Sequence, residues 1–229
     1  MSTVLSGDET QAISGLPVTI RSYTTGQDLC REGDKPTQSC LLLEGYACRS
    51  KGVGDGRRQI FSFHIPGDVP DLHSLYIDYM DHDLTTLTPS TVAFIPHASL
   101  RNMMLTHPRV VGALWRETLI DAAIFREWMV GMGQRSGLAR IAHLLCEMMV
   151  RLKAVGLMDG LTVRLPITQE QIGDAIGLSP VHVSRVFKEL RLKGLIRTEG
   201  RTLIVRSWSA LVETGEFDPG YLHLRAPPN

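Results

Sequence analysis

Apolar and polar positions alternate in short runs over the first part of the chain, and this pattern ends near Ser99. Before that point the runs, such as CLLLEGYACRS and QIFSFHIPGD, are bounded by turn residues, among them the glycine-rich loop KGVGDGRR and the pair Gly67-Asp68. Short alternating runs separated by turns are typical of antiparallel strands. Because no long helix interrupts them, we expect a β-barrel or β-roll domain over residues 1–108.

A long helix is predicted next. The stretch RVVGALWRETLIDAAIFREWMVGM contains no proline, and its apolar residues recur at spacings of three and four. Apolar residues such as Trp115 and Leu119 make the helix apolar on more than one side, so it needs cover from two directions, for instance from its own β-domain and from a second copy of the chain. A buried helix of a monomer is the alternative. One heptad register defines a candidate dimerisation seam of Val111, Leu114, Thr118, Asp121, Phe125, Trp128 and Met132.

Glycines follow this helix and predict a hinge. Gly131, Gly133 and Gly137 interrupt the helical pattern, which gives a helix-and-hinge segment over residues 109–135. We assign residues 136–210 to a second domain and residues 211–229 to an irregular C-terminal tail.

The stretch ITQEQIGDAIGLSPVHVSRVFKELRLKGLI carries the signals of two helices joined by a tight turn. Thr168 and Gln171 match a capping box at the start of the first helix. Gly177 suits the left-handed conformation that ends it. Ser179 caps the second helix, and Pro180 fits its first turn. A short strand pair, RTEGRTLIVRS, follows, so the pattern predicts a winged helix-turn-helix.

The second helix divides into an apolar and a polar face. Val183, Val186, Phe187 and Leu190 turn inward, while His182, Ser184 and Arg185 lie opposite, in the half that enters a DNA major groove first. Arg185 can donate two hydrogen bonds to guanine, a contact worth about 1–3 kcal/mol in discrimination between bases. Phosphate contacts position a protein without reading sequence. The candidates for that role are Thr168, Gln169, Ser179, Lys188 and Arg201.

Composition and charge agree with this interpretation. With 43% hydrophobic and 21% charged residues the chain is ordinary for a globular protein. No apolar run approaches the roughly 18 residues of a membrane helix, and the first residues lack a signal-peptide pattern, so we expect a cytoplasmic protein. The net charge of zero is unevenly distributed, because residues 180–206 hold seven basic and two acidic residues. Such a local excess attracts phosphate backbones.

The helical pair, with ARIAHLL before it and GRTLIV after it, resembles the winged-helix domain of the Crp/Fnr family of bacterial transcription regulators. The β-rich amino half, the Gly-Asp turn after FSFHIP and the long helix extend the resemblance over about residues 18–207. It implies an α+β fold with a cyclic-nucleotide-binding-like jelly roll. It also implies a homodimer that binds a two-fold site on double-stranded DNA and contacts RNA polymerase, with no membrane partner.

The resemblance also assigns base readers. It implies this role for Arg185 and for Ser184 beside it. Val181 stands where the family usually has a glutamate, and an apolar side chain there can touch a thymine methyl group instead of accepting from cytosine.

The family's cyclic-nucleotide cassette corresponds to GDVPDLHSLYIDYMDHDLTTLTPS. Leu72 stands where cyclic-nucleotide sensors carry a ribose-binding glutamate, and His82-Asp83 stands where they carry an arginine-serine pair. No Lys or Arg occurs from Gln59 to Leu100, so a cyclic phosphate would meet negative charge without a cation, and we do not expect cyclic AMP to bind. The candidate effector pocket comprises Asp71, Leu72, His73, His82 and Asp83.

An iron–sulfur cluster, a haem or metal site and a redox switch are the other possible signals. The four cysteines lie far apart without a C-x-x-C pair, so we do not expect an iron–sulfur cluster. Histidines among the aspartates leave a haem or metal site open, and the cysteines leave a redox switch open. Turns rich in Asp and His are more often solvated loops. We therefore predict no cofactor and no bound metal, and either an unidentified effector in the β-roll or none.

No G-x-S-x-G, H-E-x-x-H or P-loop pattern is present, and we do not expect an enzyme. The predicted function is sequence-specific DNA binding in transcription regulation. The alternatives are a protein-interaction module that uses the helix pair for protein contact, and a haem-, metal- or redox-sensing regulator of the same fold.

Overall fold

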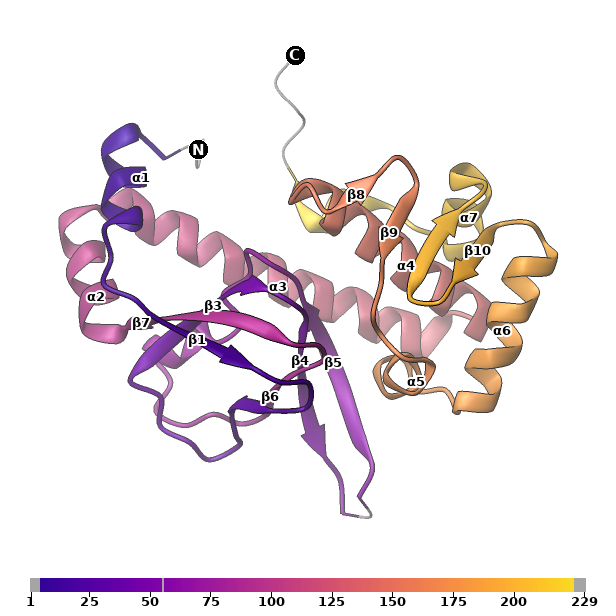
Figure 1. The fold of residues 1–229 in the computed structure, drawn as a ribbon, viewed down its shortest axis with the longest axis horizontal. Coiled ribbons are helices and arrows are strands. Elements are labelled where there is room, and N and C mark those ends of the chain that lie inside the picture. The colour runs from indigo at the N-terminus through magenta and orange to yellow at the C-terminus, as the bar shows by residue number, and fades with distance from the viewer. Residues whose placement is uncertain (1–4, 55, 225–229) are drawn as a thin grey trace. The chain divides into compact units, whose positions relative to one another are not determined.

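The protein folds into two compact units, shown in Figure 1. The computed structural model describes residues 5–54 and 56–224. One unit contains the chain up to Lys51 together with Phe63–Ala122, and the other contains Gly52–Ser62 and the chain from Ala123 onward. Among the described residues, no helix is both long and apolar enough to cross a membrane.

Two antiparallel sheets confirm the predicted β-roll. Strands β1 (Thr19–Tyr23), β7 (Ser90–Pro96) and β3 (Gln38–Glu44) pair in the order β1-β7-β3. Strands β2 (Asp28–Cys30), β6 (Asp83–Thr86), β4 (Ala47–Gly52) and β5 (Arg58–His64) pair in the order β2-β6-β4-β5. Their apolar side chains meet in one core of Cys30, Cys40, Leu42, Ala47, Met80, Leu84, Val92 and Phe94.

Helices flank the strands of this domain. They are α1 (Gly7–Ser14), the 3₁₀ helix η1 (Leu72–Leu75), α2 (His97–Thr106) and the first half of α3 (Pro108–Gln134). The sequence pattern did not predict α1, which begins with a capping box between Ser6 and Glu9. Helix α3 continues through Gly131 and Gly133, so the predicted interruption is confined to the two residues between Gln134 and Gly137.

The second unit contains the predicted winged helix-turn-helix. Its helices are α4 (Gly137–Ala154), α5 (Gln169–Ile176) and α6 (Pro180–Leu192). Strands β10 (Ile196–Glu199) and β11 (Thr202–Val205) form the predicted strand pair. Two further short strands, β8 (Met158–Asp159) and β9 (Thr162–Arg164), extend it to a sheet of order β10-β11-β9-β8.

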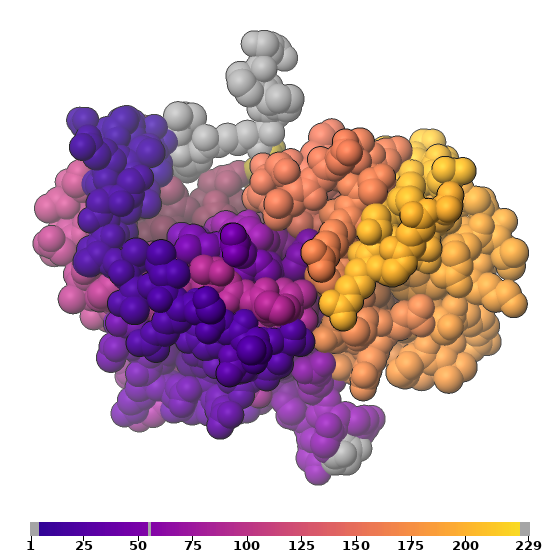
Figure 2. All heavy atoms as spheres, in the orientation of Figure 1, coloured from indigo at the N-terminus to yellow at the C-terminus, as the bar shows by residue number. Residues whose placement is uncertain are grey.

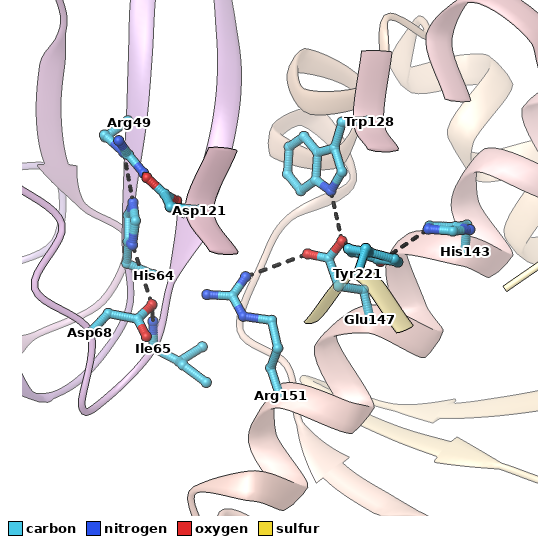
Figure 3. Close-up of polar contacts among 10 residues, drawn as sticks. All are labelled: Arg49, His64, Ile65, Asp68, Asp121, Trp128, His143, Glu147, Arg151 and Tyr221. Atoms are coloured by element: carbon cyan, nitrogen blue, oxygen red, sulfur yellow. Dashed lines mark hydrogen bonds and ion pairs between the residues drawn. The ribbon is translucent and has the colours of Figure 1, made fainter. Parts of the chain in front are cut away.

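The C-terminal segment is ordered up to Leu224, and the prediction of an irregular tail was wrong for these residues. It forms α7 (Trp208–Gly215) and the 3₁₀ helix η2 (Pro219–Leu222), while residues 225–229 lie outside the described part of the chain. The Tyr221 hydroxyl donates to the fully buried carboxylate of Glu147 in α4 (2.8 Å), which also accepts from the indole Nε1 of Trp128 in α3 (2.9 Å; Figure 3). A buried carboxylate needs such donors, so this group ties η2 and α3 to α4.

Candidate nucleic-acid interface and sensor-domain polar groups

Helices α5 and α6 are positioned by the local signals that predicted them. The Thr168 hydroxyl accepts from the backbone N–H of Gln171 (3.1 Å), and the Gln171 side chain accepts from the backbone N–H of Thr168 (2.9 Å). Gly177 ends α5 with φ of +69°, a left-handed conformation that favours glycine. The Ser179 hydroxyl then caps α6 by accepting from the N–H of His182 (3.3 Å).

Gly173 makes the close approach of the two helices possible. A Cβ atom at this position of α5 would lie 2.5 Å from the carbonyl oxygen of Leu178 in the turn. The interhelical turn therefore packs directly on the backbone of α5. The sequence-based interpretation placed apolar residues on the inner face of α5 but did not identify this glycine.

Helix α6 presents the predicted polar face. Val183, Val186, Phe187 and Leu190 are buried, whereas Ser184, Arg185 and Lys188 are exposed, as is Val181 with 76% of its surface accessible. Figure 2 shows the orange atoms of this part of the chain at the surface of the second unit. His182 differs from the other predicted base readers, because it is half-buried and its ring lies against Gly137 at the start of α4.

The predicted phosphate contacts all lie on the surface. Thr168, Gln169, Ser179, Lys188 and Arg201 are exposed. The capping oxygens of Thr168 and Ser179 act as acceptors within the protein, which leaves each hydroxyl hydrogen able to donate to a phosphate. Arg201 lies with Gly200 in the turn between β10 and β11, as predicted for the tip of a wing.

The predicted dimerisation seam of α3 is divided between two environments. Leu114 packs against the β-domain core, the Asp121 carboxylate pairs with Arg49 in β4, and Trp128 is buried. Val111 and Thr118 are half-buried, and Phe125 and Met132 are exposed. The helix therefore uses part of the seam within its own chain. Its large exposed apolar side chains are Trp115, Leu119, Phe125, Met129, Val130 and Met132.

A buried arginine lies inside the β-domain, and the sequence-based interpretation did not identify it. Arg49 is 8% exposed; its Nε donates to His64 Nε2 (3.0 Å), and its terminal nitrogen pairs with Asp121 of α3 (Figure 3). Because His64 accepts at Nε2, the proton of its neutral ring lies on Nδ1 and is directed at Asp68 Oδ2 (3.2 Å). Burial and the nearby Arg49 both lower the pKa of His64, which favours this neutral ring.

The structure places the five predicted pocket residues in different surroundings. Asp71 Oδ1 accepts from the backbone N–H of Cys40 (2.7 Å), and burial raises the pKa of Asp71 to about 6. Leu72 is part of the buried interior, and Asp83 Oδ1 accepts from the backbone N–H of Glu32 (2.9 Å). Only His73 and His82 come together, with ring centroids 5.2 Å apart.

The four cysteines are buried, and Cys30 and Cys40 lie in the same core of the β-roll. Cys30, Cys40 and Cys48 lie on β2, β3 and β4, and Cys146 lies on α4 in the other unit. Burial raises the pKa of Cys30 and of Cys146 to about 12 and raises that of Cys40 well above its ordinary value. Because the thiolate is the reactive form, this environment opposes a redox role for these three thiols.

Two domain families match the chain. The sequence profile of the cyclic nucleotide-binding domain matches residues 20–107, and that of the Crp-like helix-turn-helix domain matches residues 139–214. The first match covers the β-roll and α2, and the second covers α4 through most of α7.

Several characterised regulators are similar over most of their length. The transcriptional activator protein FnrL of Cereibacter sphaeroides is 30% identical over 202 residues, which cover 86% of this chain and 81% of the relative. The nitrogen fixation regulation protein FixK of Bradyrhizobium diazoefficiens is 29% identical over 175 residues, or 76% of this chain and 72% of the relative. The solved structure of FixK2 from Bradyrhizobium japonicum superposes with a TM-score of 0.79 at 25% identity, covering 93% of this chain and 100% of that structure.

Proposed function

The chain belongs to the Crp/Fnr family of DNA-binding transcription regulators, and we propose that it acts as a homodimer that reads a two-fold operator with the α6 helices of its two copies. In this proposal the protein works in the cytoplasm, where it also contacts RNA polymerase. Its characterised relatives are transcription regulators, so we assign it no enzymatic activity.

One observation carries the proposal. Helix α6 buries its apolar face and exposes Ser184, Arg185 and Lys188 together on the other side. In this arrangement Arg185 reads guanine through two hydrogen bonds, while Ser184 and Val181 contact neighbouring bases. Phosphates of the DNA backbone are held by Lys188, Arg201, Gln169 and the capping residues of α5 and α6, Thr168 and Ser179. The ring of His182 lies against Gly137 and is only partly exposed. It contributes to base reading only if the edges of the bases in the DNA major groove come close enough to contact it.

The dimer is proposed to form through the exposed apolar face of α3. Trp115, Leu119 and Met129 expose 65%, 51% and 57% of their surfaces, at spacings that place them along a single side of the helix. Large apolar side chains gathered in this way mark a surface that another protein covers. A second copy of the same helix is the partner that a two-fold operator requires.

The interior of the β-roll does not fit a cyclic nucleotide. Phe63, Leu42 and Leu84 fill it and are at most 1% exposed, and Arg49 is engaged by Asp121 and His64. Three cysteines lie in the β-domain and the fourth, Cys146, lies in the other unit, so the β-domain does not supply the four thiolates of an iron–sulfur cluster. We therefore propose neither group as the signal for this protein.

Selection from a random duplex library tests the proposal. We expect the full-length protein to enrich a two-fold symmetric sequence with half-sites about one helical turn apart, and to bind it with an affinity that falls steeply as salt rises. Sedimentation should give two chains per complex. Failure to enrich any sequence, combined with capture of protein partners through α5 and α6, would instead support a protein-interaction module.

Replacing Arg185 by Ala tests the base-reading role directly. We expect discrimination at one base pair of each half-site to fall by about 1–3 kcal/mol, or roughly 5- to 150-fold, because one bidentate contact is lost. Arg191→Ala is the matched control, since Arg191 is an exposed arginine on the same helix but on another face. It should leave the selected sequence unchanged. An unaltered sequence preference in Arg185→Ala would refute the assignment.

A further inference from the structure

A third side chain of the sensor domain, Asp81, lies beside the pair of His73 and His82. His73 lies on η1, and Asp81 and His82 lie just before β6. One ligand atom from each of the three lies within 4.8 Å of the other two. His73 is half-buried, His82 is 5% exposed, and the Asp81 carboxylate is exposed to solvent. The group therefore opens to the surface through its carboxylate and has a path by which an ion can enter.

The polar atoms of this group are arranged as ligands. Nε2 of His73 is buried and has no hydrogen-bond partner among the residues that the structure describes, which is costly for a polar atom unless another species binds it. Oδ1 of Asp81 lies 2.7 Å from Nδ1 of His82. The carboxylate and the ring nitrogen share one proton across this short distance, and a metal ion that takes the place of that proton is bound by both atoms.

The backbone just before Asp81 is fixed by hydrogen bonds at Met80. Met80 is 2% exposed, its N–H donates to the carbonyl of Asp34 (3.0 Å), and its own carbonyl accepts from the N–H of Gly33 (2.7 Å). Ligands bound to an ion at about 2.1 Å lie roughly 3.4 Å apart in a tetrahedral site. The three ligand atoms already lie within 4.8 Å of one another, so side-chain rotation, above all of the exposed Asp81, adjusts them to that spacing.

We propose that His73, Asp81 and His82 bind a divalent transition-metal ion of the Zn²⁺, Fe²⁺, Co²⁺ type in the sensor domain. Two imidazole nitrogens and one carboxylate oxygen favour these ions over Mg²⁺ and Ca²⁺, which prefer oxygen ligands. Three protein ligands also leave a coordination position for water or a small molecule. This inference replaces the expectation from sequence that no metal binds, and it does not depend on how the protein reads DNA.

Direct titration of the full-length protein tests the site. The protein is stripped with a chelator, dialysed and titrated with Co²⁺, whose visible d–d bands report nitrogen and oxygen coordination, and the Zn²⁺ content is measured separately by elemental analysis. We expect about one ion per chain and a higher melting temperature with the ion bound. Less than half an ion per chain at saturation would overturn the proposal.

Matched variants assign the ligands. Asp81→Asn and His73→Gln should each weaken Co²⁺ binding roughly tenfold or more. Asp78→Asn, an exposed acid of the same loop, and His223→Gln, an exposed histidine elsewhere, should bind as the wild type does. Asp81 is on the surface, so its variant is expected to fold, and far-UV circular dichroism verifies this for all four. Equal affinities in the ligand and control variants would refute the site.

Discussion

Gly173 shows how a single missing side chain shapes the DNA-binding motif. A Cβ at this position would lie 2.5 Å from the Leu178 carbonyl oxygen, well inside the contact distance of a carbon and an oxygen. The neighbouring atom belongs to the backbone, so the turn itself would have to move. At Gly133 in α3, by contrast, a Cβ would meet nothing within 4 Å, and the glycine there only lowers helix propensity.

Gly173→Ala is therefore expected to lower the free energy of unfolding by about 1–3 kcal/mol and to weaken operator binding, because the turn shifts α6 relative to α5. Urea unfolding at fixed protein concentration and duplex titration measure the two effects. The control is Gly133→Ala in α3, where a Cβ would meet nothing within 4 Å. That variant should gain up to about 1 kcal/mol from helix propensity. A neutral Gly173→Ala variant would contradict this account of the turn.

At the scale of elements, Arg49 connects a strand of the β-roll to the long helix. Its guanidinium pairs with Asp121 of α3 and donates to His64 of β5, while only 8% of the residue is exposed. Removal of Asp121 leaves the Arg49 charge without its carboxylate partner in a poorly solvated place. The pair therefore fixes the position of the first half of α3 on its own β-domain.

A double-mutant cycle measures this connection. Arg49→Gln and Asp121→Asn should each destabilise the protein, and the double variant should be less destabilised than the sum of the two, with a coupling energy of about 1–3 kcal/mol. Chemical unfolding at one protein concentration provides the four free energies. Arg31 and Asp28, an exposed ion pair in the same domain, serve as the control cycle with a coupling below about 1 kcal/mol. Equal coupling in both cycles would remove the special role of Arg49.

At the scale of the whole molecule, buried histidines make stability depend on pH. Burial lowers the pKa of His64, His97 and His143 in the folded state. The unfolded chain then binds protons that the folded chain does not as the pH falls through about 6.5. Asp71 acts in the opposite sense, because its raised pKa of about 6 makes the folded state hold a proton more tightly. His73 and His82 also have lowered pKa values, so five histidines act against Asp71 and acid should destabilise the fold.

We expect the melting temperature, measured in the presence of a chelator, to fall steadily from about pH 7 to about pH 5. His143→Gln should reduce this slope, since the His143 ring is buried and its Nδ1 donates to the carbonyl of Gly215 (3.0 Å). The exposed His223→Gln variant should leave the slope unchanged. A melting temperature that rises as the pH falls would show that carboxyl groups such as Asp71, and not the histidines, determine how stability depends on pH.

Short-range signals were enough to locate the helix-turn-helix. The Thr168–Gln171 capping box, the Gly177 turn and the Ser179 cap each involve residues at most four positions apart, and all three formed as predicted. The alternating runs likewise predicted the β-roll. Interactions of this range are encoded in neighbouring residues, so a pattern along the chain is sufficient to identify them.

Features that rest on distant partners could not be read from such patterns. Arg49 is buried because Asp121, 72 positions away, accepts its hydrogen bond, and η2 is held through Tyr221 by Glu147, 74 positions away. The division of the α3 seam and the meeting of His73 with His82 depend in the same way on how the elements pack. Periodicity identifies which residues of a helix or strand are apolar, but the stability of a buried charge or a short helix comes from side chains that only folding brings close.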